Sequence, residues 1–104
     1  YFFSSTCPFC RAQMKDIVKN IDDFNGSRIY LIANSVGDLK AFENRYELGQ
    51  YQNITVGMDS GYVLQDYYKV NAVPYLAVFN KDRKLTRVFA GKTSASQLKQ
   101  AMAL

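Results

Sequence analysis

The sequence predicts an α/β fold, with a central mixed sheet of about five strands and helices on both faces. Short apolar runs typical of buried strands alternate along the chain with segments whose apolar residues recur at helical spacing. Such alternation indicates parallel strands covered on both sides, and two successive strand patterns near the C-terminus predict an antiparallel hairpin. The 104 residues, 48% of them hydrophobic, fit one domain with a sizeable core.

The expected order of elements is β-α-β-α-β-α-β-β-α. In the first half we expect a strand at 1–4, a helix from Pro8 to about Ile21, a strand at 28–33 and a helix from Asp38 to about Tyr46. In the second half we expect a strand at 54–57, a short helix from Ser60 or Gly61 to Tyr68 that buries Val63, Leu64 and Tyr67, strands at 76–79 and 85–90, and a last helix opened by the capping box of Ser94 and Gln97.

Composition excludes several classes of function. The only two cysteines lie three positions apart and there is no histidine, which excludes a disulfide framework and leaves too few ligands for structural zinc. The net charge of +4 is scattered, with its densest group at 81–87 near a predicted turn, so we expect a solvated surface rather than a nucleic-acid site. No apolar stretch approaches the ~18 residues of a membrane span.

The segment Cys7-Pro8-Phe9-Cys10 carries the chemistry. It follows a predicted strand and begins a predicted helix, so Cys7 is expected at the helix N-terminus, where free N–H groups and the helix dipole stabilise a thiolate. Cys10, one helical turn further, is expected to be shielded. Cys7 can then attack a partner disulfide, and Cys10 can resolve the mixed disulfide. The alternative is that both cysteines are inert apolar residues. We disfavour it, because packing alone does not require a pair of cysteines at a strand-to-helix turn.

Pro74 is the second functional signal. It stands between a predicted short helix and a predicted strand. A cis Val73–Pro74 bond there would leave the Val73 backbone free to pair with an extended substrate segment. A trans proline that simply begins the strand is the alternative.

Together these segments resemble the thioredoxin superfamily. The likeness is greatest to the ResA/TlpA-like thiol–disulfide oxidoreductases, which adjoin the AhpC/TSA redoxins. It runs over nearly the whole chain and rests on two stretches, 1–10 with its Cys-x-x-Cys and 68–80 with its proline before a strand. The resemblance implies a thioredoxin-like fold, with Cys7 as nucleophile, Cys10 as resolving thiol and Pro74 as a cis proline facing them, while Val73 would bind substrate.

Three residues depart from or modulate the pattern. Thr6 stands where many members of the superfamily carry tryptophan, and Pro8 follows the first cysteine, as in glutaredoxins and disulfide isomerases. With Phe9, these residues are expected to set the reduction potential, and hence the direction of the reaction. The resemblance implies no metal and no organic cofactor, because the Cys7–Cys10 pair is itself the redox centre.

The implied partners are protein thiols or disulfides and an upstream electron donor. The resemblance also implies a periplasmic or extracytoplasmic location in a bacterium. The chain begins inside an apolar run, at Tyr1-Phe2-Phe3, so we expect that a native N-terminal segment, with a possible membrane anchor, precedes it.

Three alternatives stay open. A peroxiredoxin-type thiol peroxidase would use Ser4 three residues before Cys7 and an arginine such as Arg83 or Arg87. A glutaredoxin fits less well, because residues 91–94 replace its usual Gly-Gly-x-x-Asp segment. A non-catalytic protein-binding module would use exposed tyrosines, for which the candidates are Tyr62, Tyr67, Tyr68 and Tyr75, although half-buried packing is the interpretation we favour for them.

Overall fold

The computed structural model describes residues 1–104, and its helices and strands alternate as the sequence predicts. The helices are α1 (Pro8–Lys19), α2 (Val36–Tyr46), α3 (Val63–Tyr68) and α4 (Ala95–Met102), with 3-10 turns η1 (Ile21–Phe24), η2 (Leu48–Gln50) and η3 (Ser60–Tyr62). The strands are β1 (Ile29–Ala33), β2 (Ile54–Met58), β3 (Tyr75–Phe79) and β4 (Leu85–Ala90). No helix has the length and apolar character needed to cross a membrane.

The strands form two pairs rather than a regular sheet of about five strands. β1 and β2 pair in parallel, and β3 and β4 pair as an antiparallel hairpin. Between them runs the N-terminal segment, where Phe2 bridges Ile32 of β1 and Tyr75 of β3. The strand expected at 1–4 is therefore wrong in extent. It shrinks to a single bridging residue because the chain leaves the sheet at once for the turn before α1.

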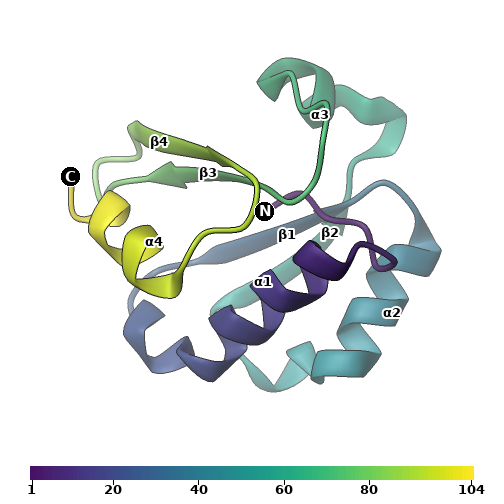
Figure 1. Ribbon diagram of the computed structural model, residues 1–104, viewed down its shortest axis with the longest axis horizontal. Helices are drawn as coiled ribbons and strands as arrows, with labels where there is room; N and C mark the ends of the chain where they lie inside the picture. Colours follow the sequence, from purple (N-terminus) through teal and green to yellow (C-terminus); the bar gives the residue numbers. More distant parts are fainter.

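The helices lie on both sides of this strand layer. Figure 1 shows α1, α2 and α4 on one side and α3 on the other. Side chains of the N-terminal segment contact helices on both sides of the strand layer, because successive side chains of extended backbone point to opposite faces. Phe3 stacks on Phe42 of α2 at 4.2 Å between ring centroids, whereas Phe2 makes edge contacts with Tyr68 and Tyr75.

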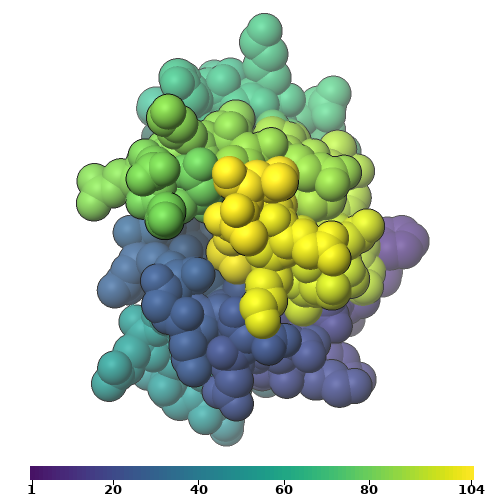
Figure 2. All heavy atoms as spheres, turned by 90° about the vertical axis from the view of Figure 1, so that its left-hand side faces the viewer, coloured from purple at the N-terminus to yellow at the C-terminus, as the bar shows by residue number.

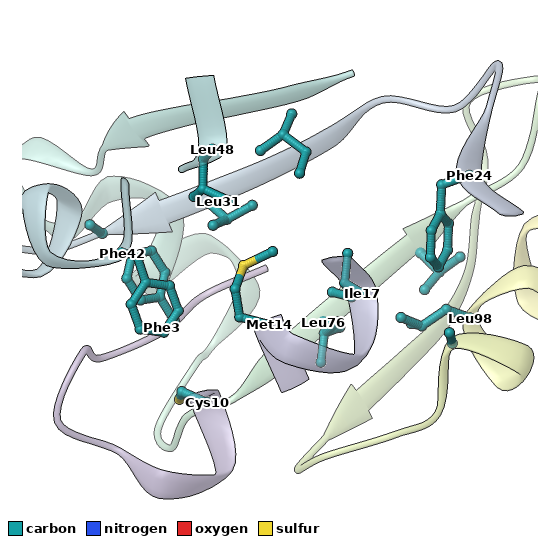
Figure 3. Packing of buried hydrophobic residues seen from close by; sticks show 14 of the residues in the cluster. Phe3, Cys10, Met14, Ile17, Phe24, Leu31, Phe42, Leu48, Leu76 and Leu98 are labelled. Carbon is teal, nitrogen blue, oxygen red and sulfur yellow. The ribbon is translucent and has the colours of Figure 1, made fainter. Parts of the chain in front are cut away.

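The core fills the space between the strands and the larger group of helices. Met14 and Ile17 of α1 meet Leu31 of β1 and Leu76 of β3 there, and Cys10 belongs to the same buried cluster (Figure 3). Figure 2 shows α4 seated between the hairpin and the chain around the end of α1, where it closes the core at that side.

Local signals explain the start of α4 and the end of α1. The predicted capping box is present at α4, where the Ser94 hydroxyl accepts from the Gln97 N–H at 3.1 Å. α1 ends at Lys19, two residues before the expected Ile21, because the Asn20 N–H turns back onto carbonyls of the last turn.

The predicted burial of α3 is wrong. Val63, Leu64 and Tyr67 are 66%, 39% and 77% exposed, and no residue of α3 is buried. The helix has only six residues and begins beyond Asp59, whose buried carboxylate accepts from two of its N–H groups. At its end, the Tyr68 ring packs edge-on against Phe2, and the Tyr68 carbonyl accepts from the Tyr75 hydroxyl at 3.1 Å.

The Phe3–Phe42 stack predicts a large loss of stability when it is removed. Phe42→Ala should lower the free energy of unfolding by about 3–5 kcal/mol, because the side chain is 1% exposed and its removal leaves a cavity. Urea denaturation measures the change. Phe9→Ala is the matched control, since Phe9 is 65% exposed and should change stability by less than about 0.5 kcal/mol. Equal losses in both variants would contradict this account of the core.

Candidate active site

Cys7 occupies the N-cap position of α1. Its backbone is extended, with φ −82° and ψ 119°, and Pro8 takes the first helical position, where no N–H is required. The Cys7 Sγ accepts a hydrogen bond from the Cys10 N–H at 3.3 Å. The sulfur thus takes the place of a capping oxygen among the free N–H groups of the helix start, a position that favours negative charge.

Cys10 lies one turn further along α1 and is buried. Its exposed fraction is 0%, whereas Cys7 is half-buried, and both are free thiols in this structure. Burial is the main cause that raises the pKa of the Cys10 thiol to about 12, and its proximity to Cys7 and Asp38 adds to the rise, while a backbone hydrogen bond with Ser4 opposes it. Cys10 is therefore a protonated, protected thiol at neutral pH.

Val73 and Pro74 lie beside Cys7, although they are far from it in sequence. The Cys7 thiol donates to the Val73 carbonyl at 3.8 Å, and the Val73–Pro74 peptide bond is cis. The Pro74 carbonyl accepts from the Gly91 N–H at 2.9 Å, while the Val73 N–H donates to no group of the protein. The structure thus brings together the four residues that the sequence predicts for catalysis and substrate binding.

The three predicted modulators surround Cys7 at the surface. Pro8 and Phe9 are exposed on the first turn of α1. Thr6 is also exposed; its hydroxyl shares a hydrogen bond with Ser4 at 3.1 Å, and its carbonyl accepts from the Arg11 guanidinium at 3.1 Å.

Two contacts at this site were not predicted from the sequence. The Tyr1 hydroxyl donates to the Cys10 carbonyl at 2.5 Å. The Asp38 carboxylate, from the start of α2, accepts from both the backbone and the hydroxyl of Ser5. They join residues nine and 33 positions apart in the chain, and no spacing or motif signals either pairing.

Of the residues named for the peroxidase alternative, Ser4 lies at the site, where its carbonyl accepts from the Cys7 N–H at 3.2 Å, and the two arginines lie on the hairpin. Arg87 stacks over the Phe89 ring at 4.7 Å, and Arg83 adopts a positive φ in the hairpin turn. Neither forms a hydrogen bond with Cys7. Among the tyrosines, Tyr68 and Tyr75 are half-buried as packing predicts, but Tyr62 and Tyr67 are exposed. A shallow groove beside α3 is lined by Tyr67, Tyr68, Lys69, Tyr75, Phe79, Leu85 and Val88.

The difference in burial predicts selective alkylation. In single-cysteine variants at pH 8, iodoacetamide should modify Cys7 in Cys10→Ser at least about 100-fold faster than it modifies Cys10 in Cys7→Ser. A thiol with a pKa of about 12 is ionised in only about one molecule in ten thousand at that pH, and Cys10 is also sterically protected. Mass spectrometry follows the adducts, and denatured protein is the control in which both should react alike. Similar rates in the folded state would contradict the burial of Cys10.

Comparison with known proteins identifies the family. Among curated proteins, no sequence matches the chain significantly. StoA from Bacillus subtilis superposes with a TM-score of 0.69 at 16% identity, over 96% of this chain and 77% of that one. A Neisseria meningitidis protein assigned as a thioredoxin superposes with a TM-score of 0.76 at 18% identity, over 95% of this chain and 67% of that one. Both likenesses confirm the predicted thioredoxin-like fold. The family model of the thioredoxin-like domain matches residues 1–104, and the chain therefore belongs to the thioredoxin-like family.

Proposed function

We propose that the chain is a thiol–disulfide oxidoreductase that reduces or exchanges disulfides in partner proteins through Cys7 and Cys10. The observation that carries this proposal is the position of Cys7, with its sulfur held by the Cys10 N–H at the helix start and the second thiol buried one turn below. An accessible sulfur at a helix start above a protected thiol is the arrangement that two-step exchange requires.

The first step forms a mixed disulfide. The Cys7 thiolate attacks one sulfur of the partner disulfide; a Cys7–partner bond forms, the partner S–S bond breaks, and the other partner sulfur leaves as a thiolate that takes up a proton. Cys7 is the sulfur that performs this attack, because Cys10 is inaccessible and protonated.

The second step releases the partner. Cys10 loses its proton and attacks the Cys7 sulfur, so the Cys7–Cys10 disulfide forms and the second partner sulfur leaves. The partner disulfide has then gained two electrons and two protons. An upstream electron donor must restore the dithiol, and the same steps in reverse would oxidise a partner dithiol.

The backbone at Val73 supports binding of an extended substrate segment. Its N–H has no acceptor in the protein, and its carbonyl contacts only the Cys7 thiol. A substrate strand that passes over Cys7 could therefore pair with both groups, and Thr6 and Phe9 would flank it. No metal or organic cofactor enters these steps, and a periplasmic or extracytoplasmic location remains part of the proposal.

Single-cysteine variants test the mechanism. Cys10→Ser should accumulate a mixed disulfide with an oxidised protein substrate, because the resolving thiol is absent, whereas Cys7→Ser should form none. Non-reducing electrophoresis and mass spectrometry detect the adduct, and turnover in the presence of dithiothreitol should fall at least about 100-fold in Cys7→Ser. Full turnover by Cys7→Ser would contradict the assigned nucleophile.

Hydrogen exchange tests the role of Val73. In the mixed disulfide of Cys10→Ser with a cysteine-containing peptide, the Val73 amide should exchange about fivefold more slowly than in the free protein. A new backbone hydrogen bond contributes about 1 kcal/mol, which corresponds to this factor. The amide of Gln52, in an exposed loop at the far end of β2, should exchange at an unchanged rate. An unprotected Val73 amide would argue against strand-like substrate binding.

The groove beside α3 supports a second candidate function, that of a module that binds proteins through exposed aromatic residues. Tyr67 is 77% exposed at its edge, more than packing alone would predict. Cys7→Ser separates the two functions, because a binding module would retain its partner and an oxidoreductase would lose turnover.

A further inference from the structure

One face of α2 contacts the chain on both sides of the two cysteines. Asp38, Phe42 and Tyr46 follow one another at intervals of four residues, so their side chains share one face of the helix. Asp38 binds Ser5, Phe42 stacks on Phe3, and the Tyr46 hydroxyl donates to the Arg11 carbonyl at 3.2 Å. Successive turns of α2 therefore hold the segment from Phe3 to Arg11, which contains both thiols.

Asp38 is the member of this face that contacts the turn just before Cys7. Its carboxylate Oδ1 accepts from the Ser5 N–H at 3.0 Å and from the Ser5 hydroxyl at 2.5 Å. The main chain of Asp38 is itself fixed, because the hydroxyl of Ser35, the N-cap of α2, accepts from the Asp38 N–H at 3.1 Å. The carboxylate is thus held from its own helix while it binds the turn.

The other hydrogen bonds of the turn that Asp38 binds come from within the turn or from α1. The Cys7 N–H donates to the Ser4 carbonyl at 3.2 Å, the Ser4 and Thr6 hydroxyls share a hydrogen bond, and the Arg11 guanidinium donates to the Thr6 carbonyl. The Ser5 N–H has no acceptor besides Asp38. Since both Thr6 and Arg11 are on the α1 side of the site, Asp38 supplies the polar contact that ties this turn to a second helix.

We infer that Asp38 is a positioning residue for Cys7, whose carboxylate fixes Ser5 and thereby keeps the Cys7 sulfur in the N-cap position of α1. This inference rests on the proposed oxidoreductase function. Without the carboxylate, the turn from Ser4 to Cys7 is freer to move, and the sulfur spends less time within reach of the Cys10 N–H. A Cys7 sulfur that leaves this position loses the hydrogen bond from the Cys10 N–H, so it is less often placed to react.

The charge of Asp38 is consistent with this role. Burial tends to raise the pKa of its carboxyl, but hydrogen bonds from Ser5 and Ser35 outweigh it and lower the pKa below the usual value. Asp38 is therefore ionised at neutral pH and accepts from both Ser5 donors. Its negative charge also lies near Cys10, where it adds to the burial that keeps the second thiol protonated.

The test is the alkylation rate of Cys7 at pH 7 in the Cys10→Ser background, where turnover is not needed. Asp38→Ala should slow iodoacetamide adduct formation about tenfold, as expected for loss of a charge-assisted hydrogen bond. Asp38→Asn, whose side-chain oxygen can still accept from the Ser5 N–H, should recover most of the rate. Ser5→Ala, which keeps the backbone contact, should lose less than Asp38→Ala.

Glu43→Ala is the matched control, because Glu43 is exposed on the same helix and its side chain has no hydrogen bond. All variants are compared at a temperature where urea denaturation shows them folded. If Asp38→Ala does not fold, the alkylation rates of Asp38→Asn and Ser5→Ala are compared with that of the parent instead. A rate in Asp38→Ala equal to that of the parent, or no recovery in Asp38→Asn, would overturn the positioning role. If the Cys10→Ser parent still forms a mixed disulfide, such a result overturns only the role of Asp38 and leaves the proposed function intact. If the parent forms no mixed disulfide, the proposed function itself is refuted.

Discussion

The hydrogen bond from the Cys10 N–H to the Cys7 sulfur is the interaction on which the candidate site depends. It requires that α1 begin immediately after Cys7, that Pro8 need no N–H partner, and that Cys10 lie one turn below Cys7. One helical turn then separates two thiols with different environments, one half-exposed and one fully buried. The chemical difference between the cysteines follows mainly from this depth, and the neighbouring Cys7 and Asp38 add to the raised pKa of the Cys10 thiol.

The rest of the fold holds that helix start in place from three directions. Phe2 bridges β1 and β3, so the strand layer fixes where the chain enters the turn. Phe3 stacks on Phe42, and Asp38 binds Ser5, so α2 restrains the turn from the side. The loop before β3 brings the Val73 carbonyl to the Cys7 thiol. Phe2, Phe3 and Phe42 are buried, so these contacts join the surface turn to the core.

Local patterns predicted the features that neighbouring residues determine. The motif at 7–10, the proline at the first helical position and the capping box of Ser94 and Gln97 all involve residues within four positions of one another, and all are present. Features that depend on tertiary contacts were missed or mistaken. No sequence pattern indicates that Asp38 contacts Ser5, which lies 33 positions earlier in the chain. The apolar pattern of α3 also could not show that a helix of six residues would leave Val63 and Tyr67 exposed. The strand expected at 1–4 failed for a similar reason, since its length is limited by the turn that follows it.

The central claim is that Cys7 and Cys10 form one redox couple, and equilibration with dithiothreitol or glutathione buffers of known potential tests it most directly. Free thiols are counted after acid quenching at each potential. The account predicts a single reversible two-electron transition in which both thiols disappear together, at a potential between about −270 mV and about −120 mV. If no disulfide forms between Cys7 and Cys10 at any potential, or if one thiol reacts while the other stays free, the two-cysteine mechanism is wrong.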